Sequence, residues 1–209
     1  MKDWRLIYII FAKSEDKLYI SNKNRQAYFV LLSVCIIFVR INLKNCNVMF
    51  DKETYVQRRA LLKKNIGSGV LLFLGNDEQG LNYEDNAFRY RQDSTFLYYF
   101  GLSFAGLSAI IDIDEDKEII FGDELTIDHI VWMGTQPTLK EKSERVGIRE
   151  TLPSVAIISY LHKAVQKGQT VHYLPPYRPE HKLKLMDWLG IPPARQEGSV
   201  PFIRAVIAQ

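Results

Sequence analysis

The chain has 209 residues, of which 47% are apolar and 24% charged, a composition typical of a folded globular protein and not of a disordered or collagen-like chain. Its two cysteines, Cys35 and Cys46, are too few for a disulfide framework or a four-cysteine zinc site, and we expect reduced thiols in a cytoplasmic protein. The formal net charge is +3, but residues 1–48 hold 8 Lys and Arg against 3 Asp and Glu, whereas residues 49–209 hold 19 against 21. Because the larger part is slightly acidic and carries no nucleic-acid-binding motif, we expect no nucleic-acid partner.

Residues 1–48 differ from the rest and are expected to form a separate leader. Ala27–Val39 is a nearly unbroken apolar run of 13 residues, shorter than the roughly 20 that a bilayer span needs. Arg40, Asn42 and Lys44 follow the run where a signal peptide would have a cleavage site of small residues. Two interpretations stay open: a membrane-proximal anchor, or a non-native extension translated from upstream of the true start. We favour the extension, since the composition changes at Met49 and a helix start follows it.

From Met49 onward, helix and strand patterns alternate. Asp51 is expected to be the N-cap of a helix over Thr54–Lys64, and the continuous apolar run Val70–Leu74 (VLLFL) is typical of an interior strand. The aromatic run Phe96–Phe100 (FLYYF), closed by Gly101, is interpreted as another strand. The remaining expected elements are a hairpin of Gly106–Ile113 with Glu118–Phe121, strands over Ile130–Gly134 and Val171–Leu174, and helices over Thr138–Val146, Val155–Lys167 and His181–Leu189. This alternation over residues 49–209 predicts an α/β domain with a mixed β-sheet flanked by helices.

The sequence offers little that resembles a catalytic or metal motif. HExxH, GxSxG, GxGxxG and phosphate-loop patterns do not occur in it. Asp112, Asp114 and Asp116 imitate the start of a calcium loop, but Lys117 stands where that loop needs glycine, so a solvated hairpin tip is expected instead. The four histidines have no pair at i, i+4 spacing and are expected to be structural: His129, His162, His172 and His181.

Two blocks stand out from this background. Phe88–Gly101 crowds Arg89, Arg91, Gln92 and Asp93 directly before its aromatic run, either as a charged loop that caps a buried strand or as part of a site. In the second block, IVWMG, Trp132 is either a core residue or an exposed aromatic side chain presented to a ligand or a neighbouring subunit. Both alternatives stay open for each block.

From Met49 the chain resembles the N-terminal domain of Xaa-Pro aminopeptidase (aminopeptidase P), of the creatinase and prolidase group. The resemblance rests on Tyr55–Leu62 (YVQRRALL), on the long and specific stretch Tyr90–Gly101 (YRQDSTFLYYFG) and on Trp132-Met-Gly. Members of this family remove an N-terminal residue that precedes proline, with two metal ions, usually manganese, held by two Asp, one His and two Glu in a C-terminal domain of pita-bread fold. No residue of this chain matches those ligands, so the resemblance implies a non-catalytic part of a metallopeptidase with no cofactor of its own.

The resemblance also implies contact roles for this domain, which in the family holds subunits together and covers part of a neighbour's active site. Trp132 would lean toward a neighbouring subunit's substrate cleft, and Tyr90, Arg91, Gln92 and Asp93 would support that wall. A homo-oligomer is therefore expected, with a peptide carrying proline at position two as the substrate of the full-length form. Two rival interpretations remain: a free-standing module that binds peptides or a partner, and a membrane-tethered form that uses the leader.

Overall fold

The computed structural model describes residues 50–83, 86–124, 131, 134 and 136–209, which belong to one compact unit of the chain, Asn47–Gln209. The predicted leader of residues 1–48 and the predicted contact residue Trp132 therefore lie outside the described residues, as does most of the strand predicted over Ile130–Gly134. Within the described part of the chain, none of the helices has the length and apolarity to cross a bilayer.

The centre of the fold is a five-stranded sheet with the order β4-β3-β2-β1-β5. Its strands are β1 (Val70–Leu74), β2 (Ser108–Asp112), β3 (Lys117–Phe121), β4 (Glu150–Leu152) and β5 (Val171–Tyr173). β2 is antiparallel to both of its neighbours, whereas β1 pairs parallel with β5 and β3 pairs parallel with β4. Four strands consequently run in one direction, and we call the side of the sheet where β1, β3, β4 and β5 end the carboxyl edge. The predicted mixed sheet is confirmed.

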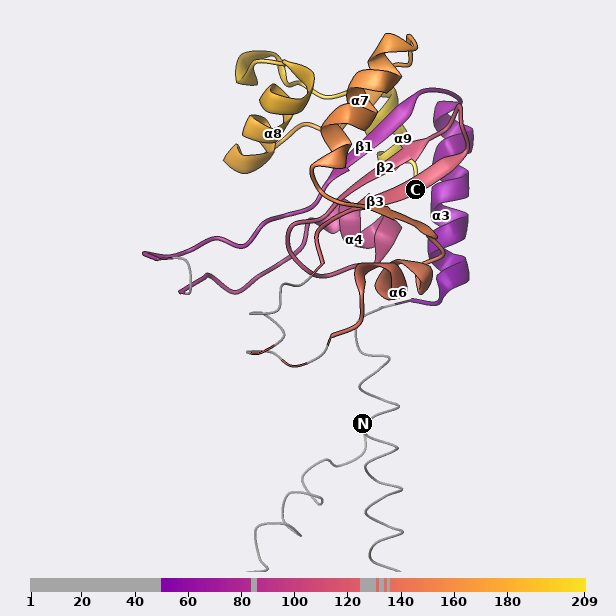
Figure 1. Cartoon of the computed structure of the whole chain (residues 1–209). Helices are drawn as coiled ribbons and strands as arrows, with labels where there is room; N and C mark the ends of the chain where they lie inside the picture. Colours follow the sequence, from indigo (N-terminus) through magenta and orange to yellow (C-terminus); the bar gives the residue numbers. More distant parts are fainter. Residues whose placement is uncertain (1–49, 84–85, 125–130, 132–133, 135) are drawn as a thin grey trace, which may run out of the picture. The chain divides into compact units, whose positions relative to one another are not determined.

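Helices cover both faces of the sheet (Figure 1). On one face, side chains of the strands pack with α3 (Lys52–Ile66), α4 (Ser94–Phe100), α6 (Leu139–Glu144) and α9 (Val200–Ile207). On the other face they pack with α7 (Ala156–Gln166) and α8 (Pro179–Leu189). The run Val70–Leu74 is apolar throughout because β1 is buried on both faces of the sheet. Leu71 and Phe73 pack in the first core, and Val70 and Leu72 pack in the second.

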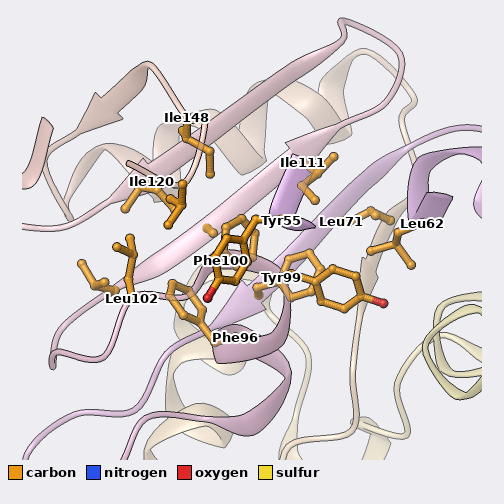
Figure 2. Packing of buried hydrophobic residues seen from close by; sticks show 14 of the residues in the cluster. Tyr55, Leu62, Leu71, Phe96, Tyr99, Phe100, Leu102, Ile111, Ile120 and Ile148 are labelled. Atoms are coloured by element: carbon orange, nitrogen blue, oxygen red, sulfur yellow. The ribbon is translucent and has the colours of Figure 1, made fainter. Parts of the chain in front are cut away.

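The aromatic run Phe96–Phe100 was predicted to be a strand, and this prediction is wrong: it forms the helix α4. Oδ1 of Asp93 accepts hydrogen bonds from the backbone N–H groups of Thr95 and Phe96, which fixes the first turn, and Gly101 ends the helix in the left-handed conformation with φ 64°. The helical period then places Phe96, Tyr99 and Phe100 on one side, all fully buried in the first core (Figure 2). Capping and burial outweigh the strand preference of aromatic residues here.

Most other predicted elements are confirmed within two residues, including the β2–β3 hairpin, α7, α8 and β5. α6 begins with a capping box in which Thr138 and Glu141 exchange hydrogen bonds. Asp51 does precede α3, but its side chain makes no capping hydrogen bond. The sequence analysis missed β4, α9 and the short 3-10 helix Pro193–Arg195.

Arg59 of α3 joins several elements around the first core. Its side chain is fully buried, and its Nε donates to Oε2 of Glu118 on β3 at 2.8 Å. The two terminal nitrogens donate to the backbone carbonyls of Tyr99 and Val146, each at 2.9 Å. Burial lowers the pKa of the guanidinium, while the adjacent Glu118 raises it. Arg59 thus fixes α3 to the sheet, to α4 and to the loop after α6.

Candidate functional site

The predicted contact residues Tyr90, Arg91, Gln92 and Asp93 lie in the segment that enters α4, beside the residues that follow β1 at the carboxyl edge. Tyr90 and Gln92 form hydrogen bonds with Asn76 through their side chains and Arg91 through its backbone carbonyl, while the side chain of Arg91 lies exposed. We call this cluster the β1–α4 corner: Gly75, Asn76, Tyr90–Asp93, Tyr177 and His181.

Gln92 is the buried centre of the corner, with 1% of its surface exposed. Its Oε1 accepts hydrogen bonds from the backbone N–H groups of Asn76 at 2.7 Å and Asp93 at 2.9 Å. Its Nε2 donates to the backbone carbonyl of Phe104 at 2.9 Å. The amide therefore satisfies three backbone groups, two in the connection between β1 and α4 and one in the connection between α4 and β2, and the side chain has no surface left for a ligand.

Asp93 uses both of its carboxylate oxygens inside the corner. Oδ1 caps α4, and Oδ2 accepts a hydrogen bond from the hydroxyl of Tyr177, in the loop between β5 and α8, at 3.2 Å. The ring of Tyr177 meets that of His181 edge-on, with centroids 6.0 Å apart. Asp93 thus links the start of α4 to the start of α8.

Tyr90 and Arg91 lie nearer to the solvent. Tyr90 is half-buried and donates from its hydroxyl to the backbone carbonyl of Asn76 at 3.3 Å. Burial raises the pKa of this hydroxyl, and the carboxylates of Asp77 and Glu78 raise it further, so the phenol stays protonated and acts as a donor. Arg91 has an exposed side chain, with a weak contact of 3.4 Å to the hydroxyl of Ser94. Among the described members of the predicted set, Arg91 is exposed, Tyr90 and Asp93 are half-buried and Gln92 is buried.

The sequence analysis missed Asn76 and His181 as parts of the corner. The side chain of Asn76 is 2% exposed and donates through Nδ2 to the carbonyl of Arg91 at 2.8 Å. Nε2 of His181, a buried residue of α8, lies 3.0 Å from the carbonyl of Gly75 and must carry the ring proton, since a carbonyl only accepts. Burial lowers the pKa of His181. The signal in the sequence that came nearest to indicating these residues was the polar residue Asn76, which follows the apolar run Val70–Leu74 after one glycine.

The hollow between the corner and the end of β5 has a volume of only about 40 Å³. Ligand pockets for small molecules usually measure about 300 to 1,000 Å³, so this hollow is too small for a small-molecule site.

In the described part of the chain, no group of three or more His, Cys, Asp or Glu side chains could bind a metal ion. Asp114 and Asp116 lie exposed at the tip of the β2–β3 hairpin, as expected. Asp112, in contrast, is buried and accepts hydrogen bonds from the hydroxyl of Tyr160 at 2.8 Å and from Nε2 of Gln169 at 3.0 Å. The acidic run therefore organises the fold around the hairpin.

Comparison with known protein families gives one match, to the aminopeptidase P N-terminal domain, over residues 55–173. This range includes the whole β1–α4 corner apart from Tyr177 and His181.

Two curated proteins illustrate the similarity. A Chaetomium globosum protein named "Probable Xaa-Pro aminopeptidase" is 30% identical over 112 residues, which are 52% of this chain and 18% of that protein. The human "Xaa-Pro dipeptidase" is 33% identical over 90 residues, 42% of this chain and 18% of that protein. The match thus spans less than a fifth of the length of either relative.

Solved structures show the same fold at lower identity. Aminopeptidase PepP of Pseudomonas aeruginosa superposes with a TM-score of 0.59 and 21% identity, over 73% of this chain and 35% of that one. The His361Ala form of Escherichia coli aminopeptidase P superposes with a TM-score of 0.57 and 18% identity, over 68% of this chain and 33% of that one. Taken with the match over residues 55–173, this shows that the chain belongs to the aminopeptidase P family and carries its N-terminal domain.

Proposed function

We propose that this chain is the non-catalytic, N-terminal part of a manganese-dependent Xaa-Pro aminopeptidase, which removes the residue preceding proline from the start of a peptide. The observation that carries the proposal is the match to the family's N-terminal domain, together with relatives named for Xaa-Pro substrates. The matched region is less than a fifth of either relative, which agrees with a domain that serves a larger enzyme.

The described residues do not fit the pair of manganese ions that the family implies, because no group of three or more potential ligands is found among them. No side chain of the described part is therefore assigned a step in the hydrolysis. We therefore propose that the metal ligands belong to a separate catalytic domain, as the resemblance implies.

The role proposed for this domain is to hold subunits together and to cover part of a neighbour's active site. Arg91, with its exposed side chain, and half-buried Tyr90 are the proposed contacts, together with Trp132. Buried Gln92 and the capping residue Asp93 support that surface from behind. Because contact residues supply neither a proton nor a nucleophile, their loss should weaken the binding of longer peptides more than the chemical step.

Activity and assembly can be tested separately. The purified 209-residue chain should hydrolyse no Xaa-Pro peptide when manganese is added, and turnover that co-purifies with the chain would contradict the non-catalytic role. Sedimentation velocity should show a homo-oligomer whose dissociation constant rises on Arg91→Glu. For the matched control we choose Lys64→Glu, an exposed residue at the far end of α3, which should leave assembly unchanged. A monomer at all concentrations would contradict the subunit-holding role.

A further inference from the structure

A second hollow, of about 310 Å³, opens at the carboxyl edge on the face of the sheet that carries α7 and α8. We call it the edge hollow. Its lining includes Asp77 after β1, Phe121 and Asp123 at the end of β3, Val155 before α7, and Lys184 and Trp188 of α8. Its volume is at the lower end of the range for small-molecule sites.

The position of this hollow follows from the topology. Strands β3 and β4 are parallel neighbours that both end here, and the chain that leaves β3 leads to α6 on one face of the sheet, whereas the chain that leaves β4 leads to α7 on the other. In open α/β sheets, ligands bind in the crevice outside the carboxyl ends of the strands, where the connections diverge. The edge hollow lies in the corresponding place, apart from the β1–α4 corner.

One part of the lining is apolar. Trp188 is half-buried and follows Lys184 by one helical turn, with the Nζ of Lys184 6.0 Å from the centre of the indole ring. Phe121 is buried, while Val155 is 77% exposed. An indole beside exposed aliphatic surface offers a large contact area to an apolar group at low cost in conformational entropy.

The charges of the lining leave a negative excess. Nζ of Lys184 lies 2.7 Å from Oδ2 of Asp77, so these two charges neutralise each other. The carboxylate of Asp123 is exposed and accepts hydrogen bonds from the backbone N–H and the hydroxyl of Ser154, but it forms no ion pair with a described residue. The lining therefore favours a ligand that carries a positive charge next to an apolar group.

We propose that the edge hollow binds the amino-terminal residue of a peptide through its free α-ammonium group and its apolar side chain. The ammonium faces Asp123, and the side chain packs on Trp188 and Val155. An amino terminus is favoured over a lysine side chain because its charge and its apolar side chain are attached to the same carbon atom, which suits a hollow of this small volume. This goes beyond the proposed function, since the site lies within this chain and requires no catalytic domain.

The test is a titration of the isotope-labelled 209-residue chain followed by NMR, with the indole N–H signal of Trp188 as the reporter. Trp188→Phe identifies this signal among the three tryptophans of the chain. The two probes are L-leucinamide, which has a free ammonium group, and N-acetyl-L-leucinamide, which has the same side chain without the charge. L-leucinamide should shift the signal saturably, with an affinity that falls at higher salt, and the acetylated probe should not.

Variants of Val155 separate binding from folding, because this exposed side chain contributes little to packing. Val155→Lys should weaken the binding of L-leucinamide about five-fold or more through repulsion of like charges, and Val155→Glu should strengthen it. The matched control is Val165→Lys, which adds the same charge to an exposed position (54%) near the other end of α7 and should leave binding unchanged.

Binding that depends on both the ammonium group and the charge at position 155 supports the proposal. No saturable shift with L-leucinamide, an equal shift with the acetylated probe, or an equal effect of Val155→Lys and Val165→Lys would each overturn it. None of these outcomes depends on a peptidase assay. The binding proposal can therefore fail while the proposed function stands, and the proposed function can fail while the binding proposal stands.

Discussion

Replacing Gln92 by alanine tests whether the most specific stretch of the sequence contributes to folding or to contacts. The substitution removes the hydrogen-bond partners of the Asn76 and Asp93 N–H groups and of the Phe104 carbonyl at once. The N–H of Asn76 is buried, while the other two groups are partly buried. The N–H of Asn76 is therefore the group that loses its partner out of reach of the solvent.

The cost follows from these three groups. A buried donor without a partner costs about 1 to 3 kcal/mol, and a partly buried hydrogen bond contributes about 0.5 to 1.5 kcal/mol. Gln92→Ala should therefore lower the free energy of unfolding by about 2 to 6 kcal/mol. For a chain of this length, this is a decrease of roughly 4 to 24 °C in the melting temperature.

Urea denaturation followed by circular dichroism measures the effect, with Arg91→Ala as the control. Arg91 is the adjacent residue, but its side chain is exposed, so its loss should change the free energy of unfolding by less than about 0.5 kcal/mol. If Gln92→Ala cost no more than Arg91→Ala, the assignment of Gln92 as a buried bridge between loops would be refuted.

Three further predictions concern the stability of the domain, each measured by urea denaturation. Arg59→Met keeps the length of the buried side chain but leaves the carbonyls of Tyr99 and Val146 without donors, so it should cost about 3 to 5 kcal/mol; a loss below 1 kcal/mol would contradict the proposed role of this guanidinium. Gly101→Ala places a Cβ atom 2.4 Å from the buried ring of Tyr55 at a φ of 64°, and a loss of about 2 to 5 kcal/mol is expected; a neutral effect would show that the ring can move. Burial lowers the folded-state pKa of His172 and His181, so as the pH falls the unfolded chain binds protons at a higher pH than the folded chain does. The contribution of these two residues to stability should therefore be constant above about pH 6.5, the usual histidine pKa, and should decrease as the pH falls from there toward the lowered folded-state pKa values. His181→Gln should make this fall shallower, and an unchanged slope would assign it to other groups.

The sequence by itself determined the parts of this protein that depend on short-range patterns. An unbroken apolar run requires burial on both faces, and Val70–Leu74 is accordingly an interior strand between β2 and β5. The helix expected over Thr138–Val146 forms as α6, whose capping box needs only Thr138 and Glu141 within one turn. The stretches Tyr55–Leu62, Tyr90–Gly101 and Trp132-Met-Gly carried the resemblance to the family that the comparison over residues 55–173 confirms.

Only the tertiary structure decided the conformation of Phe96–Phe100 and the position of β4. A short aromatic run favours a strand on local preference, but the burial of three rings on one side, together with the cap from Asp93, selected the helix. Glu150–Leu152 has no apolar pattern and becomes a strand by pairing with Ile119–Phe121 of β3, some 30 residues earlier in the chain.

The candidate sites were also decided at the tertiary level. Gln92 and Arg91 are adjacent polar residues, yet one is buried and the other exposed, because the backbone groups of Asn76 and Phe104, 16 and 12 residues away, meet at the amide of Gln92. The edge hollow unites side chains from positions 77 to 188 that share no motif. Their proximity arises because parallel strands end at the same edge of the sheet, which brings loops together whatever their separation along the chain.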